Sequence, residues 1–267
     1  MVPFASLVGM GFQFVSVLLL VIGSAVYLHR RRWLSWAAAG FGALTFFVFA
    51  LILERALHFI VLGSAGPTRA YLLAHPIAYA LYGALAAGLF EEGGRYLVMR
   101  RFMTSRRSFG DGLSFGLGHG GLEAVVVLGM TSLSNLALSL QINSGAFDST
   151  LSAPGINEHA REALLALKTT LIQASPIDFY LGGVERLFAF VLQLFFSLLV
   201  LYALKARRPR YVLYAVLAHA VVDLVPGYFQ ATGRVNVYGI EGLLLVYALA
   251  AAWGILRIKR CFEQPDA

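Results

Sequence analysis

The sequence predicts an all-α protein, a bundle of about seven helices that cross a membrane. Of its 267 residues, 59% are hydrophobic and 13% are charged, whereas a soluble domain carries about 25% charged residues. The mean hydropathy is +0.74, and apolar runs of about 20 residues recur along the chain. These observations indicate one integral membrane domain over residues 1–267.

The first apolar run, 4–28, is expected to be a permanent helix. No basic residue precedes it, and it ends in His29 and three arginines, whereas a cleaved signal peptide has the opposite layout. Six further spans are expected along the chain. The seven predicted spans are 4–28, 36–62, 74–99, 112–138, 179–204, 211–229 and 237–258.

The basic residues lie in four short clusters beside these spans. With seven spans, all four clusters fall on one side, which the positive-inside rule makes cytoplasmic, with the N-terminus outside and the C-terminus inside. The net charge of +7 is therefore a topology signal rather than a nucleic-acid footprint. The clusters are Arg30 to Arg32, Arg100/Arg101/Arg106/Arg107, Lys205/Arg207/Arg208/Arg210 and Arg257/Lys259/Arg260.

The longest connection, 141–178, is expected on the extracytoplasmic side. It contains Pro154, and its stretch 157–170 has the pattern of a short amphipathic helix on the membrane surface. The chain has one cysteine, Cys261, which excludes a disulfide framework and a cysteine-based metal site.

Ionisable residues inside three of the spans are the candidate functional residues, because such side chains are costly in a bilayer. Two histidines with several carboxylates are a ligand set for a divalent metal and for activation of water. These residues are Glu91, Glu92 and Arg95, His119 and Glu123, and His219 and Asp223.

Spacing and depth predict that these groups meet. His119/Glu123 and His219/Asp223 are i,i+4 pairs, so each pair shares one helix face. At about 1.5 Å per residue, Glu91, His119 and His219 lie roughly 10–13 Å from the cytoplasmic ends of their spans. Hydrophobicity alone does not require this common depth.

Other polar and small residues have simpler interpretations. Glu54 and His58 form another i,i+4 pair near the outer end of a span, where interfacial structure is favoured over a site. Gln193 lies deeper, and its amide is a candidate cavity-lining group. In the fourth span, glycines at four-residue spacing predict close helix packing. They are Gly112, Gly116 and Gly120.

At these residues the chain resembles the YhfC family of intramembrane metalloproteases, and more broadly the superfamily of PrsW and the CAAX prenyl endopeptidases. Those proteins carry EExxK or EExxxR, a second motif with an aromatic residue, His or Glu, and a late HxxxD or HxxxN. Here Glu91-Glu92-x-x-Arg95, His119-x-x-x-Glu123 and His219-x-x-x-Asp223 follow in that order. Arg95 comes one residue sooner than in EExxxR.

The resemblance implies a metal-dependent endopeptidase of the cytoplasmic membrane. Glu91 would activate water, and Arg95 would neutralise Glu92. His119 and His219 would bind a divalent metal, most plausibly zinc given imidazole and carboxylate groups. Asp223 would be a third ligand or would stabilise the oxyanion. The acid in the second motif, Glu123, would be a ligand or would orient a histidine.

Other functions remain open from the sequence. Without a metal, His119 and Glu91 would position water directly, while His219 and Asp223 would receive the oxyanion. Intramembrane acids and histidines also make ion relays, so a proton- or ion-coupled transporter is one alternative. A non-catalytic scaffold or immunity protein of the same fold is another. The expected partners are the bilayer and a membrane-embedded protein or lipid-linked peptide substrate, not nucleic acid.

Overall fold

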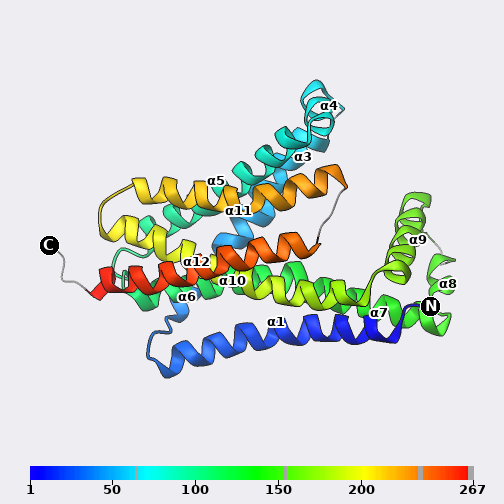
Figure 1. Ribbon diagram of the computed structural model, residues 1–267, viewed down its shortest axis with the longest axis horizontal. Coiled ribbons are helices and arrows are strands. Elements are labelled where there is room, and N and C mark those ends of the chain that lie inside the picture. Colours follow the sequence, from blue (N-terminus) through cyan, green and yellow to red (C-terminus); the bar gives the residue numbers. More distant parts are fainter. Residues whose placement is uncertain (64, 153–154, 234–236, 264–267) are drawn as a thin grey trace. The chain divides into compact units, whose positions relative to one another are not determined.

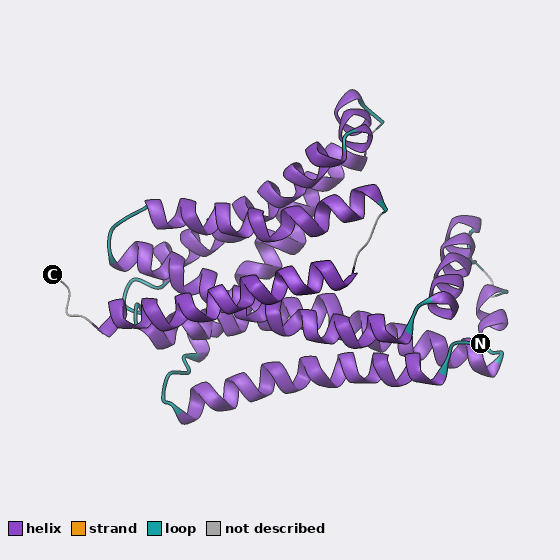
Figure 2. Cartoon of the chain, viewed as in Figure 1, coloured by secondary structure: helices purple, strands orange, loops and turns teal. Residues whose placement is uncertain are grey.

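The computed structural model describes residues 1–63, 65–152, 155–233 and 237–263. The described chain is helical, without strands (Figure 2). Within the described ranges, six helices, or helices joined through a π-helical segment, are long and apolar enough to cross a membrane. The pair α4 and α5 makes a seventh if it forms one bent span, so the predicted all-α bundle of about seven spans is confirmed.

The helices run further than the predicted spans. They are α1 (Phe4–Arg30), α2 (Trp36–Thr45), η1 (Phe46–Glu54), α3 (Arg55–Gly63), α4 (Pro67–Ala74), α5 (Pro76–Phe102), α6 (Phe109–Ala124), η2 (Val125–Gly129), α7 (Met130–Ser144), α8 (Phe147–Leu151), α9 (Glu158–Gln173), α10 (Pro176–Lys205), α11 (Arg210–Thr232) and α12 (Val237–Glu263).

The third predicted span, 74–99, is wrong at its beginning. Ala74 ends α4, His75 is extended with φ −125° and ψ 90°, and Pro76 is the first residue of α5. A proline disfavours the α conformation of the residue before it, which breaks the helix here. The axes of α4 and α5 are therefore bent by 110° at His75.

The fourth predicted span, 112–138, is too short at both ends, and the predicted loop 141–178 is largely helical. The α6–η2–α7 segment runs from Phe109 to Ser144 because polar residues continue its helix. One of them, Asn143, exchanges hydrogen bonds with the backbone of Val2, at 2.7 and 2.9 Å. The helix predicted over 157–170 is confirmed as α9, and Asn157 caps it by accepting from Ala160 N–H at 2.8 Å. Its place on the membrane surface stays a prediction. Pro154 lies outside the described residues.

The chain forms two compact units. The first comprises Met1–Leu20 and Ala124–Leu187, and the second comprises Val21–Glu123 and Phe188–Ala267. The first has an apolar core that includes Met10, Phe147 and Leu171. The single domain over 1–267 stays a prediction. All the candidate site residues belong to the second unit.

Within the second unit, α5 and α11 lie side by side (Figure 1). A Cβ on Gly88 of α5 would stand 2.7 Å from the carbonyl oxygen of Val216 on α11. In the same unit α2 meets α6, where a Cβ on Gly118 would stand 1.8 Å from the carbonyl oxygen of Ala39. Small residues thus bring these backbones into direct contact.

The four basic clusters lie at one end of this second unit. Arg107 Nη1 donates to the carbonyl of Leu204 at 3.3 Å, and Lys205 Nζ donates to that of Phe262 at 3.1 Å. Lys259 Nζ stands 5.2 Å from the ring centre of Trp33. These contacts link the connections after α1, α5 and α10 with the end of α12, which Figure 1 shows together. That this basic end is cytoplasmic stays a prediction.

Candidate active site

Helix α5 carries two consecutive buried carboxylates in its interior. Glu91 is 8% exposed and Glu92 is fully buried. Consecutive helical residues point about 100° apart, so the two side chains face different neighbours. Glu91 contacts α6, and Glu92 contacts α11.

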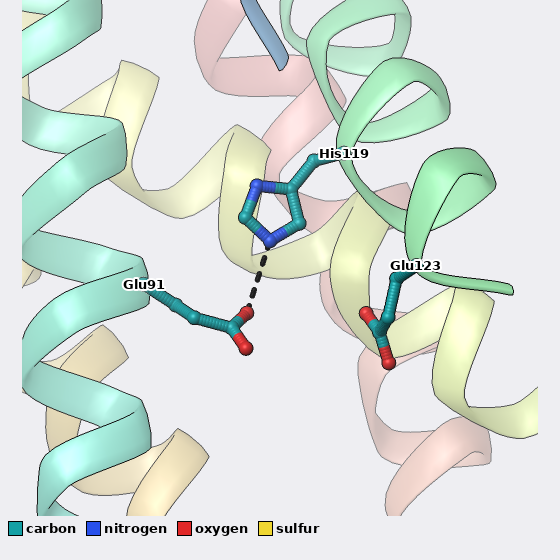
Figure 3. Close-up of side chains that lie close together, drawn as sticks. All are labelled: Glu91, His119 and Glu123. Carbon is teal, nitrogen blue, oxygen red and sulfur yellow. Dashed lines mark hydrogen bonds and ion pairs between the residues drawn. The ribbon is translucent and has the colours of Figure 1, made fainter. Parts of the chain in front are cut away.

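His119 of α6 is fully buried and reaches Glu91. Its Nε2 lies 3.0 Å from Glu91 Oε2 (Figure 3). The rings of Phe46 and Phe115 flank the imidazole, with centroid distances of 5.3 and 6.4 Å. A Cβ on Gly42 of α2 would stand 2.9 Å from the backbone nitrogen of His119, so this close packing fixes the position of the histidine.

Gln193 of α10 joins the two acids that flank His119. Its Nε2 donates to Glu123 Oε2 at 2.5 Å and to Glu91 Oε2 at 3.3 Å. The predicted glycine face of α6 is confirmed as the surface that admits α10. A Cβ on Gly120 would stand 2.8 Å from Gln193 Cβ, and one on Gly116 would stand 2.9 Å from Leu194 Cα.

Arg95 is the fully buried counter-charge of the site. Its Nη1 donates to Glu92 Oε1, and its Nη2 donates to Glu91 Oε2 at 3.4 Å and to Gln193 Oε1. One guanidinium therefore contacts both acids of the pair and the amide of α10. The i,i+3 spacing from Glu92 and the i,i+4 spacing from Glu91 make both contacts possible.

His219 of α11 stands between two carboxylates. Its Nδ1 lies 2.8 Å from Glu92 Oε1, and its Nε2 lies 3.4 Å from Asp223 Oδ2. The ring of Phe196 stacks on the imidazole with a centroid distance of 5.0 Å and an interplanar angle of 7°. The side chain of His219 is 6% exposed, whereas that of Asp223 is 40% exposed. The pair thus runs from the buried cluster toward open space.

Among the described residues, two groups of side chains have donor atoms close enough together to hold one metal ion. The first is Glu91, His119 and Glu123, and the second is Glu91, Glu92 and His219. Within each group the ligand atoms lie within 4.8 Å of one another. The two histidines fall in different groups, and Glu91 belongs to both.

The first group fits a divalent metal better than the second. In the second group, Arg95 donates to Glu92 Oε1, the same oxygen that faces His219. A guanidinium at a ligand oxygen competes with a cation there. In the first group its contact is longer, 3.4 Å from Arg95 Nη2 to Glu91 Oε2. In the first group, one imidazole and two carboxylates match the ligand types of zinc. In the described chain, Nδ1 of His119 is buried without a hydrogen-bond partner. No described hydrogen bond therefore prevents the imidazole from adopting the tautomer that binds a metal.

The charges of the cluster also favour a cation. Glu91, Glu92 and Asp223 are three carboxylates, and their described contacts include one guanidinium, that of Arg95. An acidic excess in an apolar bilayer is costly unless it is offset. A divalent ion would offset it.

The cluster lies near the middle of the helices. Counted at about 1.5 Å per residue, Glu91, His219 and His119 stand roughly 13–17 Å from the basic ends of α5, α11 and α6. For Glu91 and His119 this is deeper than the sequence predicts, because α5 and α6 extend beyond the predicted spans. The depth is about half of a hydrocarbon core roughly 30 Å thick.

A cavity of about 520 Å³ borders the cluster at Asp223. Glu54, His58 and Tyr82 line it as well. Sequence reasoning gave Glu54 and His58 to interfacial structure because they stand near the end of a span. Their i,i+4 spacing of an acid and a histidine is also that of the two motif pairs, and it is the sequence signal that favours a site.

The chain is similar to a known protein family over most of its length. The family model described as "YhfC intramembrane metalloprotease" matches residues 16–245. The uncharacterized membrane protein YhfC of Bacillus subtilis (strain 168) is 40% identical over 245 residues, which cover 92% of this chain and 93% of that protein. No solved structure matches the chain.

Proposed function

Since the chain belongs to the YhfC intramembrane metalloprotease family, we propose that it is an endopeptidase that hydrolyses a peptide bond of a membrane-embedded or membrane-proximal substrate. The observation that carries this proposal is the buried contact between Glu91 and His119 inside a cluster that also holds three more carboxylates, an arginine and a second histidine. Apolar helices do not need such a cluster for packing, and its burial is costly.

Glu91 is the general base of the proposed reaction. Its Oε2 faces His119 Nε2 at 3.0 Å, and Gln193 and Arg95 donate to the same oxygen from 3.3 and 3.4 Å. These three contacts orient the carboxylate and leave its other oxygen for a water molecule. A base so placed takes the proton of the attacking water and returns it to the leaving amine.

His119, Glu123 and one carboxylate oxygen of Glu91 would hold a divalent metal, and zinc is the ion that best suits these donor atoms. The other oxygen of Glu91 remains the base. When bound, such an ion supplies Lewis-acid polarisation and a lowered pKa of water. Gln193 orients Glu123 through the 2.5 Å hydrogen bond. Residues that hydrogen-bond to metal ligands commonly fix the orientation of those ligands.

His219 is assigned to contact with the oxyanion, and Asp223 is assigned to contact with the substrate. Glu92 and Asp223 face the two ring nitrogens of His219, so the imidazole is held from both sides. Arg95 in turn neutralises Glu92. Asp223 is exposed to the cavity, which makes it the member of the cluster that an incoming substrate reaches first.

The basic end of the helices is assigned to the cytoplasm, with the N-terminus outside, and the protein to the cytoplasmic membrane. In that orientation a substrate is cleaved within its membrane-spanning part, because the cluster lies near mid-depth.

The experiment compares two membrane preparations whose enzymes differ only in the side chain at position 91. Wild type and Glu91→Gln are reconstituted into vesicles with membrane proteins from a strain lacking the gene, and new peptide N-termini are identified by mass spectrometry. The proposal predicts cleavage sites within or beside apolar segments that appear with wild type and not with Glu91→Gln. Identical peptides from both preparations contradict it.

A proton- or ion-coupled carrier is the second candidate. The observation that favours it is the line of ionisable groups that continues from His219 and Asp223 along the cavity to Glu54 and His58. Such groups form relays in transporters. Ion- or substrate-dependent flux in liposomes, abolished by Glu54→Gln, would support the carrier and not the peptidase.

A further inference from the structure

The cavity beside Asp223 lies on one side of the catalytic cluster. On α5 it is lined by residues of the first turns, from Tyr79 to Ala84, and on α11 it extends from Asp223 to Gln230. The basic clusters of these helices are at their other ends, with Arg100 at the end of α5 and Arg210 at the start of α11. The cavity therefore extends from the cluster toward the end of the second unit that lacks the basic clusters.

The walls of this cavity combine two carboxylates with small residues. Glu54 and Asp223 line it, and none of its described lining residues is a lysine or an arginine. Gly83, Ala84 and Gly227 leave room beside these acids, and a Cβ on Gly83 would meet nothing within 4 Å. The volume of about 520 Å³ is that of a small-molecule pocket rather than of a packing defect.

The carboxylate of Glu54 is held in a fixed position. His58 Nε2 lies 3.3 Å from Glu54 Oε1, and His58 Nδ1 lies 2.9 Å from the Tyr82 hydroxyl. Both nitrogens of the imidazole are thus engaged, one by the acid and one by α5. The side chain of Glu54 is only 14% exposed, so water screens its charge weakly.

From this geometry we propose that the cavity is a substrate subsite for a basic side chain, a lysine or an arginine of the peptide being cleaved. The inference rests on the proposed function, because Asp223 links the cavity to the hydrolytic cluster. The apolar stem of the side chain packs against Gly83 and Ala84, and its charged head lies between Glu54 and Asp223. A basic residue is rare inside apolar segments, so this subsite selects one class of membrane substrate.

Complementarity of charge argues for this occupant over an apolar one. An apolar side chain would cover two carboxylates without compensating them, which is costly. A cationic head would pair with both. Long basic side chains are also suited to a site with an apolar wall and an acidic end, because their stems and heads have different solvation needs.

The test measures binding and not cleavage, so it is independent of the proposed activity. The probe is an apolar peptide of about 20 residues with one arginine, compared with the same peptide carrying citrulline, which has the same shape without the charge. Binding to the full-length protein in phosphatidylcholine vesicles is followed by energy transfer between dyes. Wild type is expected to prefer the arginine peptide by about tenfold.

Three variants make the result specific. Glu54→Gln is expected to abolish the preference, and Gly83→Leu is expected to weaken binding of both peptides because it fills the cavity. Glu263→Gln removes an exposed acid that lies 3.6 Å from Lys259 and should leave the preference unchanged. Equal binding of the two peptides by wild type, or an unchanged preference in Glu54→Gln, overturns the subsite. A preference without any cleavage supports the subsite and counts against the peptidase alone.

Discussion

Nε2 of His119 lies 3.0 Å from Oε2 of Glu91, and both residues are buried. The contact joins α6 to α5, and Gln193 of α10 donates to the same carboxylate oxygen. Glu91 is thus the point at which three helices of the second unit meet through polar groups. The proposed chemistry and the packing of the helices both depend on this carboxylate.

Replacement of Glu91 by glutamine should stop cleavage and leave the fold intact. Glutamine keeps the shape of the side chain and a carbonyl oxygen that accepts hydrogen bonds, but it takes no proton from water. General-base catalysis contributes about 10²–10⁴-fold, so single-turnover cleavage of an identified substrate should slow by at least about 100-fold. Glu263→Gln is the control, and a Glu91→Gln protein with wild-type turnover would refute the assignment.

Removal of Arg95 should destabilise the protein strongly. Its guanidinium is fully buried against Glu91 and Glu92, and alanine would leave both acids without this counter-charge. Loss of one partner of a buried ion pair costs about 3–5 kcal/mol. Lysine should not restore stability, because it lacks the planar fork that reaches two acids and an amide.

The measurement is the unfolding midpoint of the purified protein in detergent, with Arg95→Ala and Arg95→Lys beside the wild type. Arg260→Ala removes an exposed arginine from the end of α12 and serves as the control. Unfolding midpoints of Arg95→Ala and Arg260→Ala that both equal the wild-type value would show that Arg95 is not the counter-charge of the site.

Gly42 and Gly40 of α2 provide a matched pair for testing the packing behind His119. A Cβ on Gly42 would stand 2.0 Å from the carbonyl oxygen of Phe115, whereas a Cβ on Gly40 would meet nothing within 4 Å. Gly42→Ala should therefore lower stability by about 1–3 kcal/mol or more, and it should displace His119. Gly40→Ala should leave stability unchanged or raise it by up to about 1 kcal/mol.

Thermal unfolding of both glycine variants gives the answer in one experiment. Equal stability of Gly42→Ala and Gly40→Ala would mean that α2 and α6 do not pack as closely as the structure has them. If instead Gly42→Ala alone is destabilised, its residual cleavage activity measures how far the position of His119 depends on this contact.

The two histidines should differ in what they bind. His219 contacts Glu92 and Asp223. Arg95 donates to the same oxygen of Glu92 that faces His219, and it therefore competes with a metal ion there. His219→Ala is therefore expected to keep bound metal and to lose turnover by about 10²-fold or more, the effect of a lost oxyanion contact. Metal content and single-turnover cleavage of the same preparation test it, and loss of the metal from His219→Ala would assign this histidine to the metal instead.

Much of the fold was predictable because bilayer burial imposes simple rules. The seven apolar runs, the four basic clusters and the packing role of Gly116 and Gly120 all follow from length, charge and residue size. The bend at His75 was missed, although Pro76 carries its signal. The ends of α7 were missed because polar residues such as Asn143 find partners from distant parts of the chain.

The candidate site was predictable in its members and less so in its arrangement. Spacing put His119 with Glu123 and His219 with Asp223, but it gave no means of deciding which acid each histidine would face. That choice depends on the rotation of α6 and α11 about their axes, which Gly118 and Gly88 set by their contacts. The cavity with Glu54 was not predictable, because it depends on the packing of η1, α3, α5 and α11 together.

The metal content of the purified protein tests the central claim most directly. Wild type, His119→Ala, Glu123→Gln and His219→Ala are purified in detergent with added zinc, desalted, and measured by elemental mass spectrometry with unfolding midpoints recorded for each. About one zinc per chain in wild type and His219→Ala, lost from folded His119→Ala and reduced in Glu123→Gln, is the predicted result. Wild type without stoichiometric metal, or folded His119→Ala that keeps it, would contradict a metal centre at Glu91, His119 and Glu123.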